Sequence, residues 1–168
     1  MTARSRELDG YAGGDKAGPQ MSDPIRIRQL LALPPEVETL RSEAIRQDFG
    51  FMDRLVADWV NRTNTFNRPG ECLLGAFVAE RLIGVGGLNV DPYLPRTNVG
   101  RLRHVYVLDD WRKQGVGRLL VDRLLDEARR SFGKVRLRTD TDRAAAFYVH
   151  CGFSPVNDAT ASHVVNLA

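Results

Sequence analysis

The segment from Arg112 to Arg118, Arg-Lys-Gln-Gly-Val-Gly-Arg, constrains the fold of this chain more than any other. It follows the apolar run 105–108 and precedes a helical pattern over 119–130, which predicts a strand, a tight turn and a helix. A helix N-terminus carries unpaired N–H groups and the positive end of the macrodipole, and glycines let an anion approach the backbone. The segment is therefore a candidate cradle for a phosphate or pyrophosphate. The alternative is a glycine-assisted turn with a solvated basic rim.

The glycine pattern excludes two common nucleotide-binding motifs. No Gly-Lys-Ser or Gly-Lys-Thr follows, so the turn is not the phosphate loop that binds nucleoside triphosphates with Mg²⁺. The third glycine of the dinucleotide-binding fingerprint is absent as well.

Two segments together resemble the GNAT family of N-acetyltransferases. Residues 112–117 (Arg-x-x-Gly-x-Gly), after a strand and before an amphipathic helix, resemble the acetyl-CoA-binding signature of that family. Residues 136–153 resemble its following strand and its short Ala-rich helix that ends in Phe-Tyr-x-x-x-Gly-Phe. The resemblance covers residues 70–155 well and residues 23–69 by general layout only.

Bulk properties favour one globular domain. The chain has 168 residues, no apolar run long enough to span a bilayer and no apolar signal-peptide core. Its two cysteines lack metal-ligand spacing and make no disulfide framework, which favours a cytoplasmic location and no metal site. A net charge of +3 and a pI near 9.1 suit an anionic ligand such as CoA, and equally nucleic acid.

The organisation along the chain predicts a disordered leader, 1–22, and a single domain, 23–168. The leader is polar and rich in glycine, and Met21 is an alternative start. Periodicity then predicts an α/β fold with a mixed, partly antiparallel sheet and helices on both faces. Helices are expected at 34–47, 51–61, 116–130 and 143–151, and strands at 25–28, 72–79, 82–90, 101–108, 135–139 and 162–167. Within the third helix, residues 116, 119, 120, 124 and 128 are predicted to share one face.

The family resemblance implies that acetyl-CoA, the acetyl donor, lies where the strands ending near Leu108 and Thr139 splay apart. Thr141 replaces an Asn common in the family and can cap the helix. Tyr148 matches the usual acid position, since a phenol of pKa ~10 can protonate a departing thiolate; the alternative is a tyrosine packed for its ring area. The cofactor-binding residues implied are the main chain of Val105, Tyr106 and Val107, the loop residues Arg112, Lys113, Gln114, Gly115, Val116, Gly117 and Arg118, and also Thr141 and Phe147.

The strand before the glycine loop departs from the family pattern. Relatives carry Glu or His as general base where this chain has Arg101 or Arg103, and arginine cannot act as a base. Because side chains alternate along a strand, the two arginines share a face. They are predicted to bind a carboxylate or phosphate on the acceptor, together with Tyr93; the alternative is that they are solvated or paired with acids. Alternation places His104 on the opposite face, where we expect it to pack.

The predicted function is transfer of an acetyl group from acetyl-CoA to a primary amine of a small molecule or peptide, by direct attack in a ternary complex. Loops 48–70 and 91–100 are expected to select the acceptor. The amine is expected to lose its proton through water to another group, for which His104, Asp91, Tyr93 and Asp109 are candidates, or to enter as its small neutral fraction. A non-catalytic CoA-binding module or a basic nucleic-acid-binding module is the alternative, although no aromatic platform or recognition helix supports nucleic acid. The chain is expected to be a monomer or a homodimer and not to bind a membrane.

Overall fold

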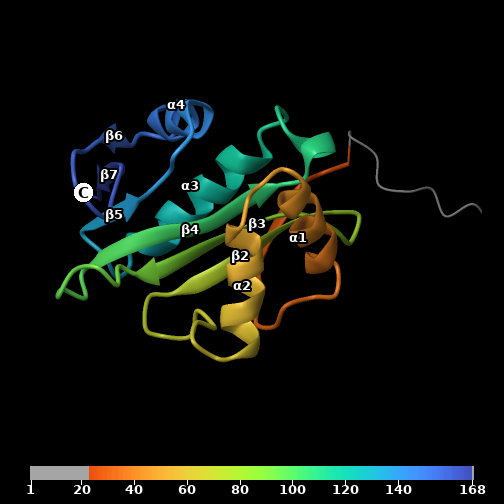
Figure 1. The fold of residues 1–168 in the computed structure, drawn as a ribbon, viewed down its shortest axis with the longest axis horizontal. Helices are drawn as coiled ribbons and strands as arrows, with labels where there is room; N and C mark the ends of the chain where they lie inside the picture. Colours follow the sequence, from red (N-terminus) through yellow and green to blue (C-terminus); the bar gives the residue numbers. More distant parts are fainter. Residues whose placement is uncertain (1–22, 168) are drawn as a thin grey trace, which may run out of the picture.

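The computed structural model describes residues 23–167, which form one seven-stranded sheet flanked by helices (Figure 1). The predicted leader 1–22 lies outside the described residues. The strand order is β1-β2-β3-β4-β5-β7-β6, and every neighbouring pair is antiparallel except β4 and β5. The strands are β1 (Arg26–Gln29), β2 (Cys72–Val78), β3 (Arg81–Val90), β4 (Val99–Val107), β5 (Lys134–Leu137), β6 (Ser154–Pro155) and β7 (His163–Asn166). The mixed α/β sheet predicted from the sequence is confirmed.

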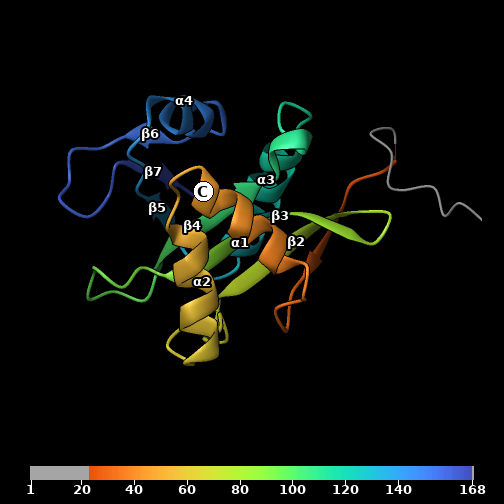
Figure 2. The same cartoon turned by 45° about the vertical axis from the view of Figure 1, so that its right-hand side comes forward.

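Four α-helices cover the two faces of this sheet (Figures 1 and 2). They are α1 (Val37–Arg46), α2 (Phe51–Val60), α3 (Val116–Ala128) and α4 (Asp142–His150), and a short 3₁₀ turn, η1 (Asp109–Trp111), follows β4. Adjacent glycines of β3 show the two faces directly. A Cβ on Gly86 would meet Leu124 of α3, and one on Gly87 would meet Phe66, beyond α2. Both faces are therefore packed at the middle of the sheet.

The sheet opens between β4 and β5. These parallel strands pair only from Val99 to Arg101 on β4, opposite Lys134 to Arg136 on β5. β4 continues six residues further, to Val107, while β5 ends at Leu137. The distal part of β4 therefore has an open edge next to the loop 112–118, which is the splayed arrangement that the family resemblance implied.

A β-bulge interrupts β4 at His104. The register with β3 shifts between Val85 and Gly87, and His104 has a φ of +58°. A bulge places one extra residue against its partner strand and turns a side chain out of simple alternation. His104 consequently lies on the α2 face, within 6.5 Å (ring centroids) of Phe51 and 6.3 Å of Phe66. It packs, as expected, but the prediction that it faces away from Arg103 is wrong.

Other details also differ from the sequence-based expectations. Leu119 of α3 is exposed, whereas Val116, Leu120, Leu124 and Ala128 are buried, because the helix turns Leu119 away from the sheet. The hairpin between β2 and β3 turns at Ala79 and Glu80, both with positive φ, one residue earlier than expected. The short strand β6 was not predicted, since two residues carry no periodicity.

Candidate active site

The loop between η1 and α3 presents a row of main-chain N–H groups. Gly115 precedes the helix with a φ of +81°, a left-handed conformation that glycine adopts without the steric cost of a side chain. The first helical bond runs from the N–H of Leu119 to the carbonyl of Gly115. Among residues 23–167, no acceptor contacts the N–H groups from Lys113 to Arg118. Six donors at a helix N-terminus are suited to an anion.

The main-chain N–H and C=O groups of Val107, at the end of β4, point toward the open edge of this strand. The N–H of Leu108 donates to Ile83 of β3. Since hydrogen-bonding positions alternate along an antiparallel strand, Val107 points its N–H and C=O away from β3. Its carbonyl accepts from Nε of Arg112 at 2.9 Å, and its N–H points toward the open edge.

The Arg112 side chain is held by other groups of the protein. Its guanidinium contacts Asp109 at 3.1 Å and Oε1 of Gln47 at 2.9 Å, and lies 5.2 Å from the centre of the Tyr106 ring. These contacts connect the loop to the end of α1, so the side chain supports the loop from within the protein. Gln114 is held similarly, since its amide donates to the carbonyl of Asp110 at 3.1 Å.

Helix α4 closes the other side of the open edge. Thr141 caps it by accepting from the N–H of Ala144 at 3.2 Å, as the sequence predicted. A Cβ on Gly117 would lie 3.2 Å from the Phe147 ring, so the second glycine of the loop allows α3 and α4 to approach. Arg118 spans the same gap by donating to the carbonyl of His150 at 2.7 Å and to Asp122 at 3.1 Å.

Tyr148 follows Phe147 and is half-buried. Its ring meets Phe147 edge to face at a centroid distance of 5.0 Å and Phe153 at 5.7 Å. Burial raises the pKa of its phenol above the usual value, and within residues 23–167 the hydroxyl has no hydrogen-bond partner. A protonated phenol with a free O–H can donate a proton.

The two arginines of β4 lie on the same face, as predicted, but in different surroundings. Arg101 is buried: it contacts Asp91 at 3.3 Å, donates to the carbonyl of Thr160 at 2.8 Å and stacks 4.6 Å over the Tyr93 ring. Arg136, its neighbour on β5, also faces Asp91, at 3.6 Å. Burial lowers the pKa of Arg101, and the Asp91 charge opposes this effect. The donors of the Arg101 guanidinium are thus bound to groups inside the protein.

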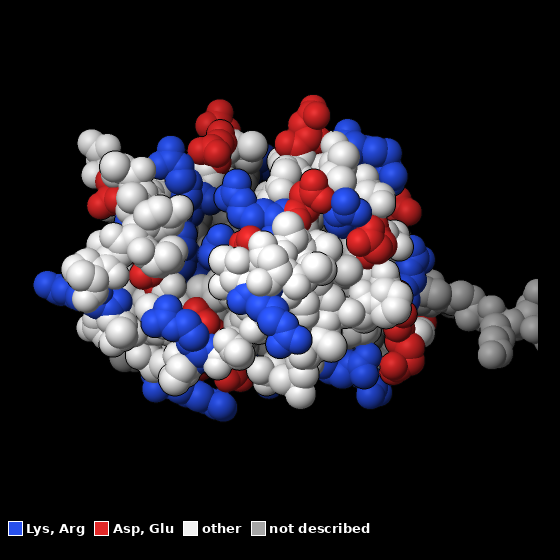
Figure 3. All heavy atoms as spheres, turned by 60° about the horizontal axis from the view of Figure 1, so that its bottom comes forward, with Lys and Arg blue, Asp and Glu red and all other residues white. Residues whose placement is uncertain are grey.

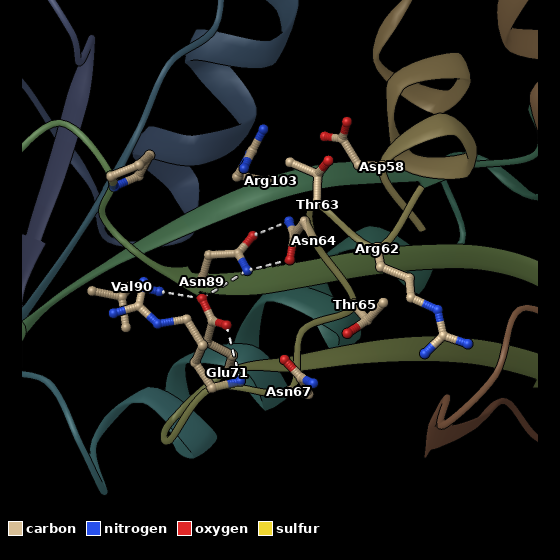
Figure 4. Close-up of a pocket in the computed structure, with 12 residues that line it drawn as sticks. Asp58, Arg62, Thr63, Asn64, Thr65, Asn67, Glu71, Asn89, Val90 and Arg103 are labelled. Atoms are coloured by element: carbon tan, nitrogen blue, oxygen red, sulfur yellow. Dashed lines mark hydrogen bonds between the residues drawn. The ribbon is translucent and has the colours of Figure 1, made fainter. Parts of the chain in front are cut away.

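Arg103, by contrast, lines a pocket of about 410 Å³ and has no ion pair with another described residue (Figure 4). The pocket lies between the α2–β2 connection, the end of β3 and the middle of β4. Its wall residues are almost all polar: Asp58, Arg62, Thr63, Asn64, Thr65, Asn67, Arg68, Glu71, Asn89, Val90, Pro92 and Arg103. Most of them belong to the loops 48–70 and 91–100 that the sequence singled out, but no sequence signal pointed to Glu71 or Asn89.

His104 lies next to Arg103 under the rings of Phe51 and Phe66, and neither ring nitrogen has a hydrogen-bond partner among residues 23–167. Burial, reinforced by the Arg103 charge, lowers the pKa of His104 to about 3, while the nearby main chain of Phe51 opposes this weakly. His104 is therefore a neutral imidazole and a poor base in this conformation.

Lys and Arg side chains gather around a hollow of the surface in the space-filling view (Figure 3).

Within residues 23–167, no three His, Cys, Asp or Glu side chains are grouped to hold a metal ion. None of the described helices has the length and apolar composition to cross a membrane.

Comparison with known proteins agrees with this geometry. The model of the acetyltransferase (GNAT) family matches residues 35–153. Many solved structures share the fold, and three of them illustrate the likeness. A protein from Exiguobacterium sp. 255-15 is 23% identical, with a TM-score of 0.77, over 85% of this chain and 93% of its own. An acetyltransferase from Streptococcus agalactiae is 17% identical, with a TM-score of 0.64, over 83% and 95%. The yncA protein of Salmonella typhimurium, determined with its cofactor acetyl-CoA, is 17% identical, with a TM-score of 0.60, over 86% and 94%. The chain therefore belongs to the acetyltransferase (GNAT) family.

Proposed function

We propose that this acetyltransferase transfers an acetyl group from acetyl-CoA to a primary amine of a small molecule or peptide, by direct attack of the amine in a ternary complex. One observation carries the proposal: the open edge of β4 runs directly into a loop whose six successive N–H groups, Lys113 to Arg118, have no acceptor in the described chain. A pyrophosphate needs a row of donors of this kind.

The same segments fit the rest of the donor. The main chain of Val107, with that of nearby Val105, offers strand-like hydrogen bonds to the amides of a pantetheine arm, whereas alternation turns the main-chain groups of Tyr106 toward β3. Gly117 leaves the space at the α3–α4 contact that a larger residue would fill. Acetyl-CoA supplies the acyl group as an activated thioester. Phe147 and Thr141 then shape the wall that faces it.

Tyr148 is proposed as the acid. Its hydroxyl donates a proton to the sulfur as the C–S bond breaks and the C–N bond forms, and the attacking amine loses its own proton to water. Because burial raises the pKa of the phenol, Tyr148 holds its proton across the pH range in which an amine becomes neutral. With His104 buried and its pKa near 3, we propose that no side chain of β4 acts as a direct base.

Calorimetry of acetyl-CoA binding tests the proposal. A Gly115→Glu, Gly117→Glu double variant places side chains and negative charge in the amide cradle, and should weaken binding at least about 100-fold. The matched control is Gly50→Glu, Gly133→Glu, because a Cβ at either position meets nothing within 4 Å. Circular dichroism of each variant checks that it folds.

Wild-type protein that is folded but binds no acetyl-CoA would refute the donor site. Binding without thiol release from any amine would instead favour a non-catalytic CoA-binding module.

A further inference from the structure

We infer that the polar pocket beside β4 binds the acceptor, and that this acceptor carries, besides its amine, a carboxylate or phosphate held by Arg103. The inference rests on the proposed function, since it assigns the second substrate of that reaction. It concerns the 410 Å³ pocket between the α2–β2 connection, the end of β3 and the middle of β4, which we call the acceptor pocket.

The charges of the acceptor pocket leave a positive excess. Three arginines line it, Arg62, Arg68 and Arg103, and none forms an ion pair within residues 23–167. Of the two acids, Glu71 is already engaged. Its carboxylate accepts from the amide of Asn89 at 2.8 Å, and from the main-chain N–H groups of Val90 and Arg68 at 2.9 and 3.1 Å. An anion thus finds guanidinium donors that no protein carboxylate occupies.

The floor of the acceptor pocket is polar and already ordered. The side-chain amides of Asn64 and Asn89 donate to each other's carbonyl oxygen, both at 2.9 Å (Figure 4). Asn64 also accepts from the N–H of Phe66. These bonds fix the loop against β3 before any ligand arrives. A pre-formed polar site favours a hydrophilic ligand over an aliphatic one.

Arg103 is the donor best placed to hold the anion. It is half-buried, whereas Arg62 and Arg68 are exposed. A guanidinium that loses part of its water without gaining a partner is unfavourable, and a bidentate carboxylate or phosphate compensates it. Two residues away on the same face, Arg101 shows the alternative, because Asp91 satisfies it. No acid does so for Arg103 in the described chain.

The position of Arg103 links the acceptor pocket to the donor. The pairing of β4 with β5 ends at Arg101, and the bulge follows at His104. Arg103 therefore lies on the first part of β4 that has an open edge, the edge that continues to Val107 and the amide loop. An acceptor anchored there has its amine beside the segment proposed to hold the thioester.

Matched pairs of amines provide the test. One pair is β-alanine and its neutral amide, and the other is O-phosphoethanolamine and ethanolamine. Thiol release from acetyl-CoA is measured for each member, with rates corrected for the neutral amine fraction. We expect the anionic member of at least one pair to have a kcat/KM at least tenfold higher, and the pair that shows it tells carboxylate from phosphate.

Variants then locate the effect. Arg103→Gln should raise KM for the preferred anionic amine about tenfold or more and leave KM for its neutral partner unchanged, since only the charge-assisted bonds are lost. Arg103→Lys, which keeps the charge but not the fork, should recover part of the loss. The matched control is Arg26→Gln, because Arg26 is exposed on the edge strand β1, away from the central strand β4, and forms no ion pair with a described residue.

A second readout does not need turnover. Phenylglyoxal modifies free arginines, and peptide mass spectrometry reports modification at Arg103 with and without each amine. Protection by the anionic members alone supports the inference. Absence of both a turnover preference and protection overturns it, as does an equal KM change for both members of a pair. If the folded wild-type protein does not bind acetyl-CoA, the proposed donor site is refuted. The phenylglyoxal protection of Arg103 then decides by itself whether the acceptor pocket binds anionic amines.

Discussion

The proposed donor site and the proposed acceptor pocket of this protein are built in opposite ways. The donor side uses main-chain groups of one continuous stretch, from the end of β4 through the loop to the start of α3, and its donors are N–H groups that every residue but proline carries. The acceptor pocket uses side chains from α2, the α2–β2 connection, β3 and β4. A contiguous backbone site can be recognised in sequence, whereas a site of scattered side chains exists only after folding.

The contrast continues within β4, where Arg101 and Arg103 share a face but not a role. The first is held by Asp91 and a main-chain carbonyl, and the second faces the pocket. Asp91 follows β3 and its N–H pairs with Val99, at the start of β4. Asp91, between the pocket residues Val90 and Pro92, thus holds a buried charge cluster with Arg101 and Arg136.

Of the substitutions considered, Asp91→Asn should lower the stability of the protein most. A small loss of stability would contradict the contrast between the buried Arg101 and the free Arg103. Asp91→Asn leaves the buried Arg101 and Arg136 without their shared carboxylate, and losing one partner of a buried ion pair costs about 3 kcal/mol or more. Urea unfolding measures this loss. The control Asp126→Asn breaks only the exposed pair with Arg129 and should cost less than about 1 kcal/mol. Equal effects of the two substitutions would contradict the structural role of the cluster.

Tyr148→Phe tests the donor side at its chemical step. We expect kcat to fall about 100-fold, because the acid is lost, with little change in acetyl-CoA affinity or in stability, since the hydroxyl has no partner in residues 23–167. Because burial raises the pKa of Tyr148 above 10.0, wild-type kcat should not decline between pH 7 and 9. A decline there, or an unchanged kcat in the variant, would argue against Tyr148 as the acid.

His104 gives an intermediate effect that depends on pH. Its pKa is about 3 in the folded protein and 6.5 in the unfolded chain, so the unfolded state binds the extra proton between these values. Stability is fully present above pH 6.5 and is lost as pH falls toward 3, with a loss of roughly 2 kcal/mol at pH 5. The free energy of unfolding of the wild type should be lower at pH 5 than at pH 8, and this difference should be smaller in His104→Leu. The same slope in both proteins would mean that His104 is solvated.

Thr141→Ala should have the smallest effect and sharpens the donor side of the comparison. The variant loses the one side-chain bond that caps α4, to the N–H of Ala144, at a cost of about 1 kcal/mol. The melting temperature should then fall by about 2–4 °C, while Thr141→Ser should retain nearly all of the stability. A large loss of acetyl-CoA affinity would show that Thr141 contacts the donor directly.

The sequence by itself determined the elements that depend on local patterns. Gly115 marks the left-handed residue before α3, Thr141 marks the cap of α4, and the alternation and apolar runs predict the sheet. These features are readable because turn, cap and period depend on residues within a few positions of one another. For the same reason, the loop from Lys113 to Arg118, with its row of free N–H groups, is recognisable from its residue pattern alone.

Only the tertiary structure decided which polar side chains are free. Arg101 and Arg103 are equivalent in a strand pattern, yet Asp91 and Thr160, 10 and 59 residues away, occupy the first. A bulge brings His104 to their face, contrary to alternation, and Glu71 is joined to Asn89 across 18 residues. Partners that are distant along the chain meet only through sheet pairing and packing, and the desolvation and pairing of a charge depend on those partners.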